Sequence, residues 1–315
     1  MSGVVIGIDT SNYTTSVAVI DESGELLANL KRPLSVKQGE RGLRQSDALF
    51  LHTVNLPSLI EEAGSIINGR PILAVGVSDR PRNAEGSYMP CFLAGVSAAT
   101  GVSVAAGAPL YRFSHQCGHI MAALYSSGRL ELSSEQFTAL HVSGGTTEML
   151  SVTPAERGFN TEIVGGTKDL NAGQVIDRIG VYMGFPFPAG MHLEDAARKN
   201  TKPIPRRKLA VDGCYMNLSG VENMAVQLYR DTGDVGLTSA FVLDFIGRSI
   251  LSVCEAREAE CGKMPFVFAG GVMSNGMIKD ILSRGRDSAF AEPMLSADNA
   301  VGIAVLALSA YNSEN

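Results

Sequence analysis

Two stretches far apart in the chain share one pattern, and this repeat constrains the fold more than any other feature. Residues 4–21, VVIGIDTSNYTTSVAVID, read as a β-branched strand, a tight polar turn and a returning strand. Residues 137–153, FTALHVSGGTTEMLSVT, repeat this order with a Ser-Gly-Gly turn. A fold that is built twice repeats its opening hairpin, so the pattern predicts an internal duplication. Two unrelated hairpins are the alternative.

Helical segments alternate with strands over the rest of the chain. Helices are expected at residues 52–67, 91–107, 238–261 and 295–311, and residues 264–285 read as a buried strand, a Gly-Gly turn and a helix. Alternation of this kind predicts the α/β class with mixed sheets. A length of 315 residues is enough for two lobes. Residues 188–223, which contain KPIPRRK, are expected to form a surface insertion.

Composition narrows the setting in which the protein works. The net charge of −6 provides no global basic surface, so a nucleic-acid partner requires a local basic patch or a helper protein. Five cysteines without a CxxC pair indicate a reducing, cytoplasmic location. The N-terminus has no basic region before its first apolar run, and no uncharged run of about 18 apolar residues is present. We therefore expect neither a signal peptide nor a membrane partner.

Three turns that follow strands carry small or oxygen-bearing residues: Asp9 to Ser11, Ser143 to Gly145, and Gly270 with Gly271. Glycine lets a ligand approach the backbone, and successive free N–H groups form a nest for an anion. Two such turns facing each other across a cleft would bind a polyphosphate, and the third would lie against adenine or ribose. Any single turn is more often only a turn. All three in this order are typical of the nucleotide cleft of the actin, Hsp70 and sugar-kinase (ASKHA) fold.

His115 and His119 have the i, i+4 spacing that places two imidazoles on one side of a helix. Such a pair can supply two nitrogen ligands to one divalent metal, and Asp298 is a candidate third ligand. This ligand set suits Fe(II) or Zn(II). The alternatives are polar residues at a helix start, and helix capping by Ser296 or Asp298. Gln116 stands where a zinc peptidase HExxH motif has its glutamate, which argues against a metallopeptidase.

The sequence SHQCGH at residues 114–119 resembles the HMEGH motif of the TsaD/Gcp family. These proteins are tRNA N6-adenosine threonylcarbamoyltransferases, formerly called O-sialoglycoprotein endopeptidases. Other segments are similar to family motifs in the same order along nearly the whole chain. They are GIDTS, LHVSGGTTEMLSVT, NAGQVIDRIG, NLSGVEN, AGGVMSN and SADNAVGIA.

The resemblance implies an ASKHA fold with two lobes, residues 1–107 with 300–315 and residues 108–299. It implies metal coordination by His115, His119 and Asp298. The implied substrate contacts are His141, Val142, Ser143, Gly144, Gly145, Asp177, Gly190 and Asn275, to which the turns add Asp9, Ser11, Gly270 and Gly271. The implied donor is threonylcarbamoyl-AMP, and the implied acceptor is an adenosine of ANN-decoding tRNA. Accessory subunits of the family would be partners in a hetero-oligomer.

Several positions depart from the family pattern. Tyr13 and Thr14 replace two acids, Thr146 replaces a histidine, Cys117 replaces the glutamate of HMEGH, and Ala189 replaces a glycine. A loop at 79–90, DRPRNAEGSYMP, replaces a GPGL segment.

Two hypotheses follow from these departures. The first is a metal-dependent transferase with altered activity, in which Arg80, Arg82 and Glu85 of the new loop substitute for lost groups; a solvated loop is the alternative. The second is a nucleotide- and metal-binding paralogue that acts as a partner or regulatory subunit without turnover.

Overall fold

The computed structural model describes residues 2–11, 13–35, 43–296 and 300–315. The chain forms two compact units. Unit 1 consists of Met1–Ser133, Pro154–Asn160 and Met294–Asn315, and unit 2 of Ser134–Thr153 and Thr161–Pro293. These units are defined by how densely the residues pack, and not by the lobes of the fold family. The lobe boundaries expected from the sequence therefore stay a prediction.

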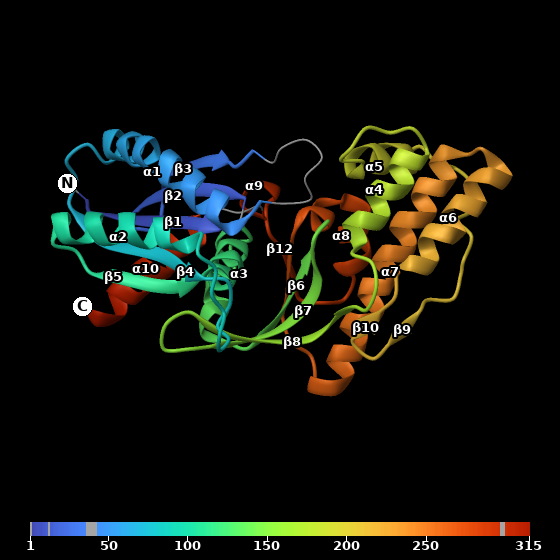
Figure 1. Cartoon of the computed structure of the whole chain (residues 1–315). Helices are drawn as coiled ribbons and strands as arrows, with labels where there is room; N and C mark the ends of the chain where they lie inside the picture. The colour runs from blue at the N-terminus through green and yellow to red at the C-terminus, as the bar shows by residue number, and fades with distance from the viewer. Residues whose placement is uncertain (1, 12, 36–42, 297–299) are drawn as a thin grey trace. The chain divides into compact units, whose positions relative to one another are not determined.

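Unit 1 is built on a mixed sheet with the strand order β3-β2-β1-β4-β5 (Figure 1). Its strands are β1 (Val4–Ser11), β2 (Thr14–Asp21), β3 (Leu26–Pro33), β4 (Ile72–Arg80) and β5 (Leu110–Ser114). β1 and β2 are antiparallel, with Ser11 opposite Thr14, whereas β4 is parallel to β1. The first predicted hairpin is therefore confirmed.

Helices cover both faces of this sheet. They are α1 (Gln45–Ile67), α2 (Phe92–Ala106), α3 (His115–Ser126) and α10 (Val301–Glu314). Isoleucines and valines of β1 and β4 pack against α1 and α2. On the opposite face α10 lies so close that a Cβ at Gly7 would fall 2.4 Å from the Ala300 carbonyl oxygen. Glycine at residue 7 of β1 and alanine at residues 300 and 304 allow this close packing of α10 against the sheet.

Unit 2 repeats this topology with the strand order β12-β11-β6-β7-β8-β10-β9. Its strands are β6 (Phe137–Val142), β7 (Thr147–Pro154), β8 (Phe159–Thr167), β9 (Val211–Asp212), β10 (Tyr215–Met216), β11 (Phe266–Ala269) and β12 (Ser288–Phe290). β6 and β7 are antiparallel and β11 is parallel to β6, as β2 and β4 are to β1. The order β8-β7-β6-β11-β12 thus matches β3-β2-β1-β4-β5, and the predicted duplication is confirmed.

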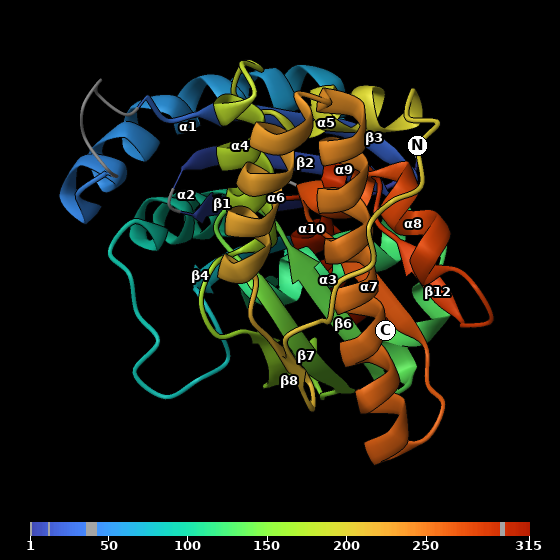
Figure 2. The ribbon, with the colours of Figure 1, turned by 90° about the vertical axis from the view of Figure 1, so that its right-hand side faces the viewer.

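The helices of unit 2 are α4 (Ala172–Tyr182), α5 (Gly190–Arg198), α6 (Ser219–Thr232), α7 (Val235–Cys261) and α8 (Gly276–Leu282). Figure 2 shows α6 and α7 side by side. Within the described ranges, α7 is the one helix long and apolar enough to cross a membrane. Its apolar window is 83% buried in the protein, so α7 serves as a core helix.

Three expected elements differ from the structure. α1 begins at Gln45 rather than at residue 52, and it contains Pro57. Residues 188–223 are more than a surface insertion, because α5 contributes Leu193 and Ala197 to the core of unit 2. The expected terminal helix is divided into α9 (Pro293–Ser296) and α10. Asp298 lies outside the described residues, and so does the side chain of Ser296, the other expected cap.

Short 3-10 helices, Leu130–Ser134 and Gly271–Ser274, complete the secondary structure of the described residues.

Candidate functional site

Unit 2 contains a cavity of about 540 Å³ at the ends of β6 and β11 and the starts of α4 and α5. Five residues expected to bind the nucleotide line it: Gly144, Asp177, Gly190, Gly271 and Asn275. These residues come from four separate segments of the chain. The structure therefore brings together, within one unit, residues that the sequence indicated only one by one.

The turn after β6 is stabilised by the side chain of its first residue, Ser143. The Ser143 hydroxyl accepts hydrogen bonds from the N–H groups of Gly145 (3.3 Å) and Thr146 (3.1 Å). The Ser143 N–H in turn donates to the Thr146 carbonyl (2.7 Å). Two amides of the expected anion nest are therefore directed at Ser143. A Cβ at Gly144 would have no atom within 4 Å, so the open side of the turn is bare backbone that faces the cavity.

Close packing brings α4 against this turn. A Cβ at Gly173 would fall 2.6 Å from the Gly144 nitrogen, so only glycine permits this approach. One turn further along α4, the carboxylate of Asp177 accepts a hydrogen bond from the Ala189 N–H (2.8 Å). Ala189 is fully buried and packs against Gly180, where a Cβ would meet that of Ala189 at 2.2 Å. The alanine that replaces a family glycine is thus accommodated by Gly180.

The far wall of the cavity follows β11. Gly270 has a φ of +98°, and a Cβ there would fall 2.3 Å from the Val142 carbonyl oxygen. Gly270 is therefore needed for backbone packing, whereas its neighbour Gly271 lines the cavity. Asn275 is the N-cap of α8 and accepts a hydrogen bond from the Ile278 N–H (3.1 Å). The prediction that Asn275 opens a helix is confirmed.

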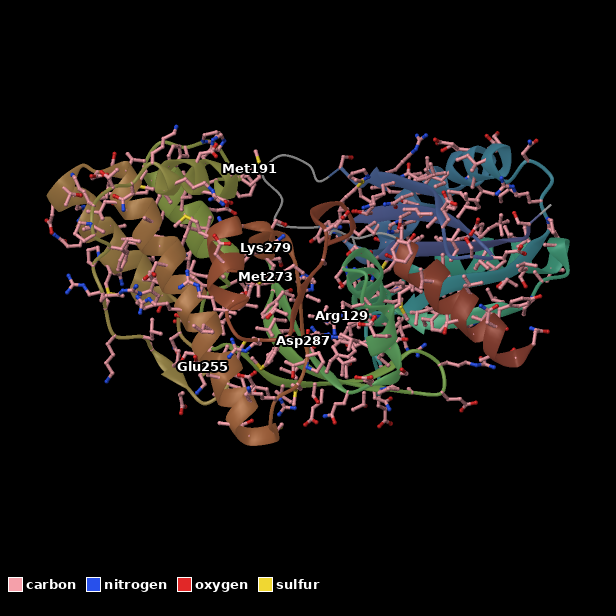
Figure 3. The ribbon with its side chains drawn as sticks, turned by 180° about the vertical axis from the view of Figure 1, so that it is seen from behind. Arg129, Met191, Glu255, Met273, Lys279 and Asp287 are labelled. Carbon is pink, nitrogen blue, oxygen red and sulfur yellow. The ribbon has the colours of Figure 1, made fainter. Side chains whose placement is uncertain are left out.

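The rim of the cavity is apolar. Phe187 and Met191 are 74% and 77% exposed, and Met191 is labelled in Figure 3. The lining carries two carboxylates, Asp177 and Glu194, and Glu194 is paired with Arg198. A backbone floor, these carboxylates and an apolar rim suit a flat ring that carries a few hydroxyl groups. The other candidates of unit 2, His141, Val142, Ser143, Gly145 and Gly270, lie on the strands and turns that shape the cavity and do not line it.

Asp169, which lies just before α4, has a structural role. It accepts hydrogen bonds from the N–H groups of Leu218 (2.7 Å) and Ser219 (3.1 Å) and from the Ser219 hydroxyl (2.6 Å). Burial acts to raise its pKa, but the hydrogen bonds from Ser219, Leu218 and Leu170 outweigh burial and lower the pKa to about 2. Asp169 therefore anchors the start of α6.

The remaining candidates lie in unit 1, around the end of β1. Asp9 is fully buried, and its carboxylate accepts hydrogen bonds from the hydroxyl groups of Ser11 (3.0 Å) and Ser78. The same carboxylate lies 3.0 Å from Nδ1 of His115. Asp9 and Ser11, which were expected at the nucleotide, thus form one network with a predicted metal ligand. A buried carboxylate is stabilised by such hydrogen bonds.

His115 and His119 lie in the first turns of α3, whose N-cap is Ser114. Their rings are 4.3 Å apart, edge to face. Because Asp9 holds Nδ1 of His115, Nε2 is the nitrogen that could bind a metal. A carboxylate that orients a ligating histidine is the usual outer-shell arrangement around protein-bound metals.

The paired rings and their carboxylate therefore fit an ion that prefers imidazole ligands. Among the residues that the structure describes, no group of three His, Cys, Asp or Glu side chains is arranged for a metal. The expected third ligand, Asp298, is outside those residues.

His52, on α1, was not identified from the sequence. It is fully buried, and its Nδ1 lies 2.8 Å from the Thr15 hydroxyl oxygen. Burial lowers the pKa of His52, and the nearby charge of Asp9 only partly opposes this, so the ring is neutral at neutral pH. A single histidine on an amphipathic helix belongs to no motif, which is why the sequence did not indicate its place beside the Asp9 network.

The loop at 79–90 follows β4 and packs against α3. Arg80 binds Asp79 and also donates to the Asn83 side-chain oxygen (2.8 and 3.2 Å). The Asn83 amide donates to the Phe159 carbonyl (2.7 Å) and to the Cys117 sulfur (3.3 Å). Cys117, which replaces the family glutamate, is thus buried beneath the new loop. Of the expected substitutes, Arg80 is engaged within the loop, and Arg82 and Glu85 are exposed.

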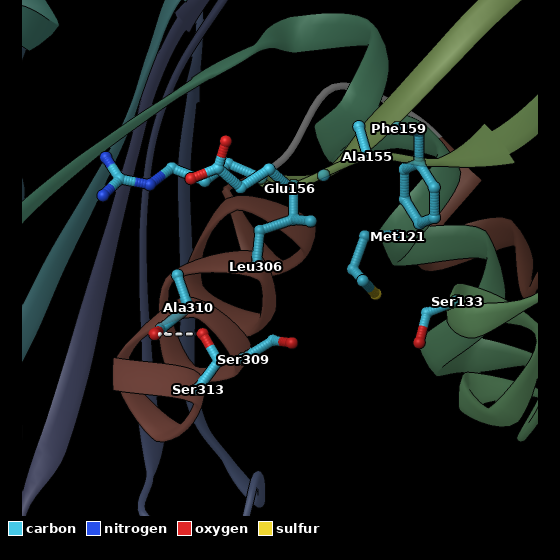
Figure 4. A pocket seen from close by; sticks show the side chains of 11 residues that line it. Met121, Ser133, Ala155, Glu156, Phe159, Leu306, Ser309, Ala310 and Ser313 are labelled. Carbon is cyan, nitrogen blue, oxygen red and sulfur yellow. Dashed lines mark hydrogen bonds between the residues drawn. The ribbon is translucent and has the colours of Figure 1, made fainter. Parts of the chain in front are cut away.

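Unit 1 also contains a cavity, of about 140 Å³, which is lined by α3, α10 and residues 155–159 (Figure 4). Its polar side chains include Ser133, Ser309 and Ser313, and the Ser313 hydroxyl donates to the Ala310 carbonyl (2.7 Å). The lining includes none of the residues expected at the site.

Comparison with known proteins agrees with this picture. The family model described as "TsaD: tRNA N6-adenosine threonylcarbamoyltransferase" matches residues 34–305. The tRNA N6-adenosine threonylcarbamoyltransferase of Streptococcus suis (strain 05ZYH33) is 30% identical, over 99% of this chain and 94% of the relative. The enzyme of the same name from Streptococcus pneumoniae (strain P1031) is 30% identical, over 99% and 93%.

Solved structures show the fold at much lower identity. Component A of (R)-2-hydroxyglutaryl-CoA dehydratase from Acidaminococcus fermentans is similar with a TM-score of 0.54 and 16% identity, over 99% of this chain and all of that chain. Full-length HypF gives 0.58 and 11%, over 98% and 55%. A ROK family glucokinase from Streptomyces griseus gives 0.52 and 13%, over 98% and all of that chain. The fold is thus of the ASKHA class, and the chain belongs to the TsaD family of tRNA N6-adenosine threonylcarbamoyltransferases.

Proposed function

We propose that this protein transfers a threonylcarbamoyl-type group from its adenylate to adenosine in tRNA, at a rate altered by its changed site. The observation that carries the proposal is the unit 2 cavity, which unites five family-matched residues. Membership of the family supports transfer to tRNA at the level of the reaction class. The donor, the metal and the changed rate are our own inferences.

The adenylate half of the donor fits the unit 2 cavity. The backbone of Gly144 and Gly271 offers flat surfaces without side chains, and a planar base can pack against them. Asp177 is one of the two carboxylates of the lining, and it can accept hydrogen bonds from ribose hydroxyl groups. Phe187 and Met191 exclude water at the rim.

His115 and His119 would hold one divalent ion, Fe(II) or Zn(II), and Asp298 would complete the set as the family resemblance implies. When bound, such an ion supplies Lewis-acid stabilisation of negative charge on substrate oxygens. Asp9 acts through His115: its carboxylate holds Nδ1 and so fixes the orientation of the ring.

The transfer itself requires positioning and charge stabilisation. The N6 amine of adenosine forms a bond to the carbamoyl carbon of the donor. The bond from that carbon to the phosphate oxygen breaks, AMP leaves with the electron pair, and the amine gives up one proton to solvent. Polar groups fixed before the reaction stabilise the charge that develops on the way.

A reduced rate is expected from the groups that this chain lacks. Removing one preorganised polar group at a reacting centre costs on the order of 10²–10³ in rate. Here Cys117 is buried against Asn83 and the Phe159 carbonyl, so its thiol does not replace the carboxylate of the family motif. Tyr13 and Thr146 replace other ionisable groups.

The test supplies the purified full-length chain with threonylcarbamoyl-AMP, Fe(II) or Zn(II), ANN-decoding tRNA and the accessory proteins of the family. Nucleosides are measured by mass spectrometry, with the Streptococcus suis relative as reference. We expect modified adenosine at a rate about 10²-fold or more below the reference. A rate equal to the reference would contradict the altered activity. No product at stoichiometric protein would instead support a partner or regulatory subunit without turnover.

We expect the protein to act in the cytoplasm.

A further inference from the structure

The proposed site makes no use of a basic segment between α5 and β9. Residues 198–208, RKNTKPIPRRK, contain Arg198, Lys199, Lys202, Arg206, Arg207 and Lys208 without an acidic residue. The whole chain carries a net charge of −6, so this segment differs sharply in charge from the average surface. We call residues 199–208 the basic strap.

Two ion pairs fix the basic strap along α7. The Lys202 ammonium lies 2.7 Å from a carboxylate oxygen of Asp234, the N-cap of α7. The Arg206 guanidinium contacts both carboxylate oxygens of Asp244, at 3.1 and 3.2 Å. At 1.5 Å of rise per residue, these two anchors are about 15 Å apart along the helix. The extended segment that follows α5 runs beside α7 in Figure 2.

Apolar contacts and prolines hold the strap further. Ile204 and Leu209 pack against the core of unit 2. Pro203 and Pro205 flank Ile204 and restrict the backbone. The strap is therefore ordered before any partner binds, which reduces the entropy lost on binding.

The cations at the end of the strap face solvent. Arg207 and Lys208 are exposed, and neither forms an ion pair with a carboxylate of the described residues. Arg206 is 67% exposed although it contacts Asp244. Three adjacent cations are thus exposed, and two of them have no anionic partner among the residues that the structure describes. Guanidinium and ammonium groups in this state bind phosphates.

We infer that the basic strap binds the sugar-phosphate backbone of tRNA. The identity of the RNA rests on the proposed function, whereas the affinity for phosphate rests on the exposed cations. A protein with a net negative charge is repelled by RNA unless a local patch offsets that charge. An ordered strap that places its cations outward provides such a patch, and backbone contacts of this kind position RNA without reading its sequence.

The test compares two double charge reversals in the full-length chain. Arg207→Glu with Lys208→Glu removes the exposed cations of the strap. Lys263→Glu with Arg284→Glu changes the net charge by the same amount at exposed positions elsewhere in unit 2. Binding of an ANN-decoding tRNA transcript is measured at several salt concentrations, and AMP binding is measured by calorimetry as a check on the fold and the cavity.

We expect the strap variant to bind tRNA roughly tenfold more weakly and to lower the salt slope by about 1–2, while the control keeps both values. Equal losses in both variants, or no loss in the strap variant, would overturn the inference. So would binding of anionic lipid vesicles through the strap without binding of tRNA. Strap-dependent tRNA binding without nucleoside modification would leave the inference standing and would contradict the proposed transferase.

Discussion

The two units begin with the same hairpin, but they use its far end in opposite ways. In unit 1 the end of β1 is filled: Asp9 is fully buried and hydrogen-bonded to Ser11, Ser78 and His115. In unit 2 the end of β6 is bare: Gly144 has no atom near its Cβ position and faces a cavity of about 540 Å³. The duplicated backbone therefore supports two different kinds of site.

The difference has a physical basis. A buried carboxylate requires fixed partners, and such a network suits the orientation of a ligand to an ion. A cavity walled by backbone suits a flat molecule that packs against it. The proposed function therefore places metal binding in unit 1 and the adenylate in unit 2. Three variants test this division of roles and a fourth tests a carboxylate that supports the fold, from the largest expected effect to the smallest.

The metal assignment is broken most directly by His119→Ala. Loss of one imidazole should weaken metal binding more than the 10–100-fold typical of outer-shell changes, so elemental analysis should find little bound Fe or Zn. His192→Ala in unit 2 is the matched control and should keep the metal content of the wild type. A full equivalent of metal in the His119 variant would show that unit 1 does not bind it through this pair.

The nucleotide assignment is tested by Gly144→Val. A Cβ at this position has no neighbouring atom within 4 Å, so the variant should fold, and its side chain would project into the cavity. We expect AMP affinity, measured by calorimetry, to fall roughly 100-fold, the upper part of the 1–3 kcal/mol typical of overpacking. Gly220→Val, at an exposed glycine of α6 with equal room, should bind as the wild type does. Unchanged affinity at Gly144 would move the nucleotide out of this cavity.

Asp9→Asn sharpens the comparison, because the sequence placed Asp9 at the nucleotide and the structure places it beside His115. Loss of the carboxylate should weaken metal binding about tenfold and leave AMP affinity unchanged. Metal titration and calorimetry on the same sample separate the two roles. If AMP affinity falls while metal affinity holds, the original expectation for Asp9 is restored.

The smallest effect concerns a carboxylate of unit 2 that has only a structural role. Hydrogen bonds overcome burial and hold the folded pKa of Asp169 at about 2, below its ordinary 3.8, so its stabilisation is present above pH 4 and is lost as the pH falls toward 2. Asp169→Asn should lower the free energy of unfolding at pH 7 by roughly 1 kcal/mol, since exposure to solvent reduces the full effect.

Denaturant unfolding at pH 7 and at pH 2.5 checks this sign. The deficit of the variant should shrink at the lower pH, and Asp280→Asn, at another carboxylate of unit 2, is the control. A deficit that grows toward low pH would contradict the role assigned to Asp169.

The sequence by itself determined the architecture. The repeated hairpins predicted a duplicated α/β fold, because strand alternation and small turn residues are local signals, and the structure contains the same strand order twice. Family-like motifs also indicated Gly144, Asp177 and Asn275, which the structure brings to one cavity. The local pattern predicted helix boundaries less well. The helix α1 begins at Gln45 and continues through Pro57, because tertiary contacts outweigh local propensity.

Only the tertiary structure decided which candidates line a cavity and which support the fold. Ser143 turns its hydroxyl into its own turn, Gly270 serves close packing on Val142, and Asp169 anchors α6. His52 meets Thr15 only because α1 folds onto β2. The physical reason is that a polar group acquires its role from its partners, and these partners come from segments far away in the chain. A linear pattern records which groups are present, and folding determines which of them meet.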